Sequence, residues 1–182
     1  MYQHIAQNKR RTWVLLAVFV ALVVALDYVM ARAFHQPALS VPILVVGFAY
    51  AAISYYFSAN IALAASGAKA VTKAQAPEVY RAVENLTIAS GLPMPGVYLI
   101  DDPSPNAFAT GRDPQHAAVA VTTGLMRLLD KSELEGVLAH ELSHVGNYDI
   151  RYMGLVMALV SVVSLIADLF LRLSFWGGGD DD

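Results

Sequence analysis

Two histidines and a glutamate lie close together in this 182-residue sequence, at His140, Glu141 and His144. If the segment is helical, residues four apart are neighbours one turn apart, so both imidazoles can reach one divalent cation. Glu141 is rotated away from them, which suits a carboxylate that takes a proton from water instead of binding the metal. With five histidines and five glutamates in the chain, chance alone yields this pattern about 0.004 times, so we predict one zinc ion per chain.

A capped amphipathic helix is predicted to carry these three residues. Ser132 followed by Glu135 matches a capping box, so the helix should begin near Glu133. Apolar side chains recur at helical spacing and should face a core; they are Leu134, Val137, Leu138, Leu142 and Val145.

The third zinc ligand is not evident in the sequence. A catalytic zinc usually takes three protein ligands and leaves a fourth position for water, and no glutamate follows the motif. Asp149 comes five residues after His144, and we expect it to hydrogen-bond a histidine or to contact the helix. Asp168, a carboxylate inside an apolar stretch, is a less favoured candidate for the third ligand. A metzincin would need glycine and histidine where Asn147 and Ile150 stand, which excludes that class.

Three apolar stretches frame a more polar middle part of the chain: residues 13–31, 41–59 and 152–173. The first two are predicted to form a transmembrane helical hairpin, with Asp27 reaching the headgroups from near a span end. Basic residues flank the outer ends of this hairpin more than its connection, so both ends should face the cytoplasm. A cleaved signal peptide is the alternative for the first stretch. The third stretch either crosses the bilayer or packs on the soluble domain.

Residues 69–150 have the pattern of a soluble domain of the α+β class. Pro77 predicts the start of a helix and Gly91 its end. Strands are predicted over residues 97–100, 106–110 and 117–122, punctuated by glycine, aspartate and proline. We therefore expect a membrane anchor over 1–68, a catalytic domain over 69–150, and a third hydrophobic helix with the start of a Gly/Asp-rich loop over 151–182.

Composition excludes several classes of protein. Hydrophobic residues make up 57% of the chain, which argues against disorder, and no cysteine is present to serve as a nucleophile or metal ligand. The net charge of −3 supplies no basic field for nucleic acid. The expected partners are the lipid bilayer and protein substrates.

Four motifs together resemble the HtpX family of membrane-bound zinc metalloproteases: HELSH at 140–144, VGNYDIR at 145–151, PNAFATG at 105–111 and VTTGLMRLL at 121–129. The two-span hairpin matches too, and the resemblance covers essentially the whole chain. It implies a gluzincin-like endopeptidase of the bacterial cytoplasmic membrane, a multi-pass protein with its catalytic domain in the cytoplasm. Its expected substrates are misfolded or damaged membrane proteins.

Residue by residue, the resemblance implies that His140 and His144 bind zinc and that Glu141 is the catalytic base. In that family the third ligand is a glutamate on a later helix, so we expect it beyond residue 182 and expect this chain to be the front part of a longer protein. The alternative is a catalytically inert membrane module that keeps the motif without the third ligand.

One strand resembles the edge strand on which gluzincins bind the backbone of their substrates. The alternative is an ordinary strand whose phenylalanine packs in the core. The residues of this predicted substrate strand are Asn106, Ala107, Phe108, Ala109 and Thr110.

Overall fold

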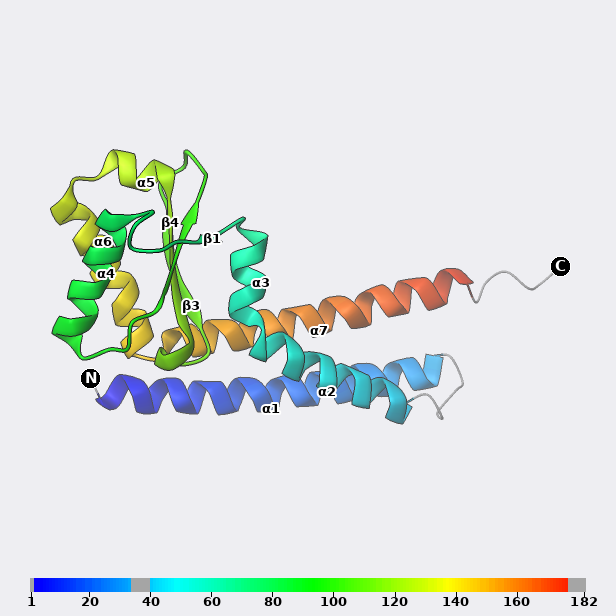
Figure 1. Cartoon of the computed structure of the whole chain (residues 1–182). Coiled ribbons are helices and arrows are strands. Elements are labelled where there is room, and N and C mark those ends of the chain that lie inside the picture. Colours follow the sequence, from blue (N-terminus) through cyan, green and yellow to red (C-terminus); the bar gives the residue numbers. More distant parts are fainter. Residues whose placement is uncertain (1, 34–39, 177–182) are drawn as a thin grey trace.

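The computed structural model describes residues 2–33 and 40–176 of the chain, and it places a small sheet with its helices at one end of three long apolar helices (Figure 1). The helical elements are α1 (Tyr2–Ala33), α2 (Ser40–Tyr56), α3 (Ser58–Ala65), α4 (Pro77–Ser90), the 3₁₀ turn η2 (Pro114–His116), α5 (Thr123–Leu128), α6 (Lys131–Gly146) and α7 (Asp149–Trp176). The strands are β1 (Lys69–Ala70), β2 (Gly96–Ile100), β3 (Ala107–Gly111) and β4 (Ala117–Thr122).

The sheet has four strands in the order β1-β2-β4-β3. Strands β2 and β4 are parallel, whereas β1 and β3 each pair antiparallel with their neighbour, so the sheet is mixed and β3 is an edge strand. The predicted strands over 97–100 and 117–122 are confirmed, and the one predicted over 106–110 begins one residue later. The predicted mixture of helices and strands is therefore confirmed.

Strand β4 is buried on both faces, which explains why all its residues before Thr122 are apolar. Val119 and Val121 point towards α4 and α6 and belong to the main core, while Ala118 and Ala120 belong to a second cluster with Leu63 of α3. Because side chains alternate along a strand, small alanines on one face let α3 pack closely and valines on the other fill the main core.

Local sequence signals fix the helices around the sheet. Pro77 is the first residue of α4, and Gly91 ends it in the left-handed conformation at φ 69°, as predicted. The predicted start of α6 is wrong by two residues, because Asp130 and Glu133 form the capping box. Aspartate caps at least as well as serine, and the earlier start adds half a turn of helix before the buried Leu134.

The apolar helices differ from the predicted pair of straight spans. Helices α1 and α7 contain windows, Thr12–Val29 and Asp149–Asp168, that are long and apolar enough to cross a membrane. The second predicted span, residues 41–59, is wrong as a single helix: α2 ends at Tyr56 and the chain bends by 68° into α3. Helix α3 then packs on β3 and β4, so its apolar side chains cover the sheet.

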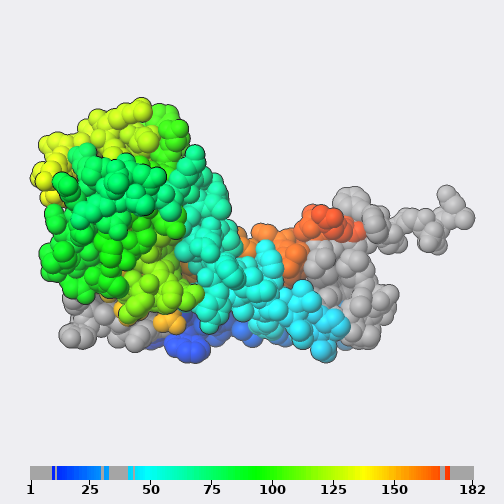
Figure 2. Space-filling view, viewed as in Figure 1, coloured from blue at the N-terminus to red at the C-terminus, as the bar shows by residue number. Residues whose placement is uncertain are grey.

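Helices α1, α2 and α7 pack against one another, so the third apolar stretch joins the other two (Figures 1 and 2). Their shared cluster includes Phe19, Val23, Leu155 and Val162. Asp27 is 6% exposed, so it is buried instead of reaching the headgroups; it lies one turn from the buried Val23 and shares its face of α1.

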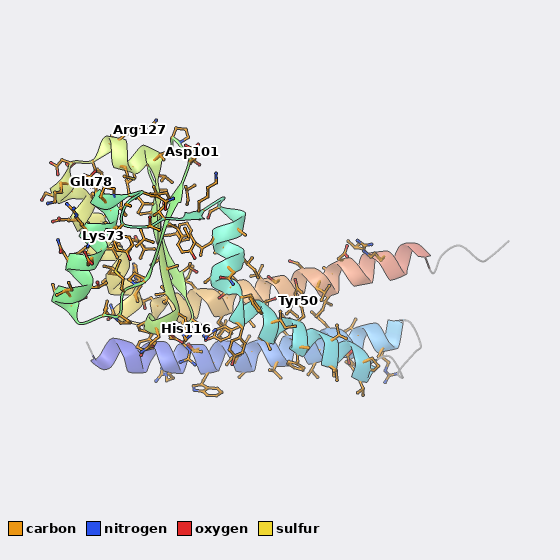
Figure 3. The ribbon with its side chains drawn as sticks, in the orientation of Figure 1. Tyr50, Lys73, Glu78, Asp101, His116 and Arg127 are labelled. Carbon is orange, nitrogen blue, oxygen red and sulfur yellow. The ribbon has the colours of Figure 1, made fainter. Side chains whose placement is uncertain are left out.

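The predicted domain boundaries stay a prediction, and two elements cross them. Helix α3 precedes residue 69 yet covers the sheet, and α7 contacts β3 as well as the apolar helices. The predicted Gly/Asp-rich loop, residues 177–182, lies outside the described residues. Figure 3 shows Asp101 and Arg127 at the end of the sheet far from α1, and His116 at the end close to it.

Candidate metal and peptide site

Helix α6 presents His140 and His144 away from the core and Glu141 at the border of its buried face. Leu138 and Leu142 are 0% and 3% exposed, whereas His140 is exposed and Glu141 and His144 are half-buried. Burial thus alternates along the helix with its 3.6-residue period, and the apolar face fixes the direction in which the two imidazoles project.

The two predicted zinc ligands face each other through the same ring nitrogen. Nε2 of His140 lies 3.3 Å from Nε2 of His144, and the ring centroids are 4.8 Å apart. Two nitrogens bound to a tetrahedral zinc at 2.0–2.1 Å lie about 3.3–3.4 Å apart. The pair therefore has the spacing that one zinc ion requires of two ligands.

Asp149 holds one of these rings in place. Nδ1 of His144 lies 2.8 Å from Oδ2 of Asp149, which confirms the expectation that Asp149 hydrogen-bonds a histidine. Because the carboxylate accepts the hydrogen of Nδ1, the lone pair of His144 is on Nε2, the nitrogen that faces His140.

The break between α6 and α7 allows this contact. Along a continuous helix, Asp149 would project away from His144. Helix α6 instead ends at Gly146, Tyr148 adopts a left-handed conformation at φ 62°, and α7 begins at Asp149. A left-handed non-glycine residue costs about 1–2 kcal/mol, so the packing of the two helices holds a turn that the local sequence does not favour.

Glu141 is joined to the edge strand. The Ala109 N–H donates to Oε2 of Glu141 at 3.1 Å, across 32 residues of sequence. This N–H therefore points away from β4, although Ala109 lies opposite Val119 in the register. Sequence reasoning missed this hydrogen bond, because no local pattern connects the two segments.

The predicted substrate strand divides its residues between two faces. Ala107 and Ala109 pack against the main core beside α6, while Phe108 packs in the second cluster near α3. Thr110 also lies within β3, and Asn106 lies just before it, with its backbone bonded to Thr122 on β4. Phe108 is thus half-buried against the second cluster, and the backbone of Ala107 and Ala109 faces the outer side of the edge strand.

The third ligand is not among these residues. In the described part of the chain, no three His, Cys, Asp or Glu side chains gather where they could hold a metal. Asp168 is far along α7, about 29 Å from Asp149 at 1.5 Å per residue. Its carboxylate accepts a hydrogen bond of 2.7 Å from Nε of Arg172, four residues on.

A carboxyl with a shifted pKa lies in the turn that follows β3. Burial raises the pKa of Asp113, but hydrogen bonds from the side chain and backbone of His116, with the charges of His116 and Arg112, lower it more. The net effect is a pKa below the ordinary value of 3.8. His116 thus stabilises the turn, and its side chain is exposed.

Comparison with known proteins identifies the family. The model of Peptidase family M48 matches residues 73–176, more than half of the chain, including both histidines and the edge strand. The chain belongs to this family. The M48 match also extends along α7, the helix whose first residue holds His144.

Curated relatives place this M48 chain in the HtpX family, which confirms the resemblance drawn from the motifs. It is 49% identical over 177 residues to Protease HtpX homolog of Tropheryma whipplei, covering 97% of this chain and 60% of that protein. The homologue of Ligilactobacillus salivarius is 45% identical over 184 residues, covering 100% and 62%. That of Streptococcus gordonii is 41% identical over 180 residues, covering 98% and 61%. The chain spans about three fifths of the length of these relatives.

Proposed function

We propose that this chain supplies the metal-binding helix and the substrate-binding strand of a membrane-anchored zinc endopeptidase. The observation that carries the proposal is the 3.3 Å separation of the Nε2 atoms of His140 and His144. M48 peptidases are zinc metalloproteases in general, which supports the choice of metal. The family resemblance implies that a glutamate on a later helix completes the ligand set.

Glu141 is the proposed proton carrier. Zinc, when bound, supplies a Lewis acid that polarises the scissile carbonyl and lowers the pKa of water. Glu141 takes the proton of the attacking water on a carboxylate oxygen and then gives it to the leaving nitrogen. Asp149 keeps Nε2 of His144 directed at the ion throughout.

The open edge of β3 is the proposed peptide-binding surface. A substrate strand would pair with the outward-facing backbone groups of Ala107 and Ala109, and its carbonyl would replace Glu141 as the acceptor of the Ala109 N–H. This pairing would place the scissile bond beside Glu141. Recognition through backbone groups tolerates many side chains. Such tolerance suits misfolded or damaged membrane proteins, the substrates that the family resemblance implies.

The apolar helices are the proposed anchor in the bacterial cytoplasmic membrane. Helices α1 and α7 have the length and hydropathy to cross it, and the sheet lies at the end of both windows that carries Thr12 and Asp149. Basic residues before Thr12 support a cytoplasmic position for that end and for the sheet beside it.

Because the chain has no cysteine, a single Lys131→Cys substitution tests the orientation. Lys131 is exposed at the start of α6. A membrane-impermeant maleimide should label it only after the cells are broken. Labelling in intact spheroplasts would place the sheet on the outer side.

Zinc uptake and peptide cleavage test the proposed chemistry. The purified protein, with the later helix that supplies the third ligand, should bind one zinc ion, and His140→Ala and His144→Ala should each abolish binding, while the matched control His116→Ala should not. Glu141→Gln should keep the zinc and lower cleavage of an unfolded protein by about 10²–10⁴-fold.

A second candidate is an inert membrane module, favoured by the two-histidine ligand set of the described residues. No zinc uptake at any concentration by the protein that includes the later helix, with no cleavage, would support this candidate and reject the endopeptidase.

A further inference from the structure

A narrow cavity lies between α1, α2 and α7, apart from the histidines. Its volume is about 270 Å³, and its lining includes Phe19, Phe48 and Leu159 at one end. Thr12, Tyr55 and Arg151 line the other end. The cavity is therefore apolar along its length and polar at one end, which we call its mouth.

The polar mouth coincides with the level at which the apolar windows begin. The window of α1 starts at Thr12 and that of α7 at Asp149, two residues before Arg151. Tyr55 is the penultimate residue of α2, which runs opposite to α1 and α7 (Figure 1). If these helices cross the bilayer as proposed above, this mouth lies where hydrocarbon gives way to headgroups, the layer that tyrosine and arginine prefer.

Arg151 offers a positive charge at this mouth. Its side chain is exposed, and within residues 2–33 and 40–176 no carboxylate forms an ion pair with it. The neighbouring Asp149 directs its carboxylate at His144. Arginine binds phosphate oxygens with two parallel hydrogen bonds, and anionic lipids are enriched in the cytoplasmic leaflet.

We propose that the cavity binds one acyl chain of an anionic phospholipid, with the phosphate held at Arg151; this rests on the proposed membrane placement. From Thr12 to Val20 the cavity follows α1 for about 12 Å at 1.5 Å per residue. A helix about 11 Å wide would fill 270 Å³ within about 3 Å of its length, so neither a second copy nor a transmembrane substrate fits inside. The first part of a flexible hydrocarbon chain does fit, because such a chain is much narrower than a helix.

Lipid retention by the purified full chain tests the proposal. In detergent micelles with added phosphatidylglycerol or phosphatidylcholine, native mass spectrometry should show one retained phosphatidylglycerol per chain. Arg151→Gln should lower this retention about fivefold, which corresponds to about 1 kcal/mol for one charge near the lipid surface. Arg10→Gln is the matched control, because Arg10 is exposed on α1 and does not line the cavity.

Two further variants address the apolar part. Ala158→Leu should fill the cavity and lower retention of both lipids. Since that variant can disturb the packing of buried Ala158, Phe48→Trp provides a second measurement. With both native tryptophans replaced by phenylalanine, brominated phosphatidylglycerol should quench Trp fluorescence at a lower mole fraction than in the same protein carrying Arg151→Gln.

Equal retention of the two lipids, or an equal loss in Arg10→Gln, would overturn the proposal in favour of general attraction at the membrane surface. Lipid-free dimers would overturn it in favour of a second copy. Alkaline extraction of cell membranes separates these failures from failure of the membrane placement. A chain that stays in the membrane pellet but retains no lipid rejects the cavity alone, whereas a chain released by the extraction rejects the placement.

Discussion

The sheet with α4 and α6 and the set formed by α1, α2 and α7 hide their apolar side chains to different degrees. Around the sheet, Val79, Val119 and Leu138 are all 0% exposed. On α1, Trp13 and Val18 are 73% and 61% exposed. The region around the sheet buries these apolar side chains within its own core. The set of α1, α2 and α7 exposes apolar side chains that water does not solvate favourably. The core around the sheet is therefore stabilised by its own packing, whereas α1, α2 and α7 need an apolar solvent around them.

A buried leucine of α6 should reveal this difference most strongly. Leu138→Ala should lower the free energy of unfolding by about 3 kcal/mol, because it leaves a cavity in the main core. The matched change Val160→Ala, at a side chain 56% exposed on α7, should cost less than about 0.5 kcal/mol in detergent. Urea denaturation of the purified protein measures both. Equal losses would show that the exposed face of α7 packs against protein.

The hydrogen bond between Asp149 and His144 joins the two regions at the proposed metal site. Asp149→Ala should lower zinc affinity about 10–100-fold, because the His144 ring loses the partner that fixes its tautomer. Competition with a fluorescent chelator measures this affinity. The stability of the sheet should change much less, and an unchanged affinity would contradict the role given to Asp149.

Gly154 tests how tightly α7 packs at the bend between α2 and α3. A Cβ there would lie 2.8 Å from Oγ of Ser58, at the bend between α2 and α3. Gly154→Ala should therefore cost about 1.5 kcal/mol through overpacking. Gly136→Ala in α6, where nothing lies within 4 Å, should instead stabilise by about 0.5–1 kcal/mol. Thermal unfolding of both variants gives the comparison, and a neutral Gly154→Ala would show that this junction is loose.

The smallest expected change in stability concerns Asp113, in the turn after β3. The pKa of Asp113 is lowered in the folded protein, so its stabilising contribution is present above about pH 3.9, the ordinary value of an unfolded aspartate. The contribution is lost as the pH falls through the lower folded pKa. Relative to Asp113→Asn, the protein should therefore lose less than about 1 kcal/mol of stability on acidification. Unfolding at pH 5, 4 and 3 measures the difference, and parallel curves would contradict it.

The sequence predicted those helices and strands whose ends and burial depend on local residues. Pro77 and Gly91 bound α4 through proline geometry and a left-handed glycine, and the buried strand at 117–122 is apolar on both faces. The four-residue spacing of His140 and His144 was enough to predict that their side chains lie close together, because one helical turn fixes their distance. These features depend on residues only a few positions apart, so they can be recognised in a single sequence.

The features that were missed depend on contacts between distant segments. Hydropathy cannot distinguish a helix that crosses lipid from one that turns to cover a sheet, so the bend after Tyr56 was not predicted. The bond from Ala109 to Glu141 joins residues 32 apart, and the left-handed Tyr148 is favoured by no local signal. Ser132 and Glu135 matched the capping pattern, but Asp130 and Glu133 form the capping box, and the burial of Leu134 favours this earlier start.

The orientation of the His144 imidazole depends on the tilt of helix α7, because Asp149 is the first residue of that helix. The helix has 28 residues and is therefore about 42 Å long. Pivoting it by about 5° around its midpoint displaces Asp149 by roughly 2 Å. A hydrogen bond of 2.8 Å does not survive such an extension. Helix α7 must accordingly keep its slant to within a few degrees for Asp149 to hold the ring of His144.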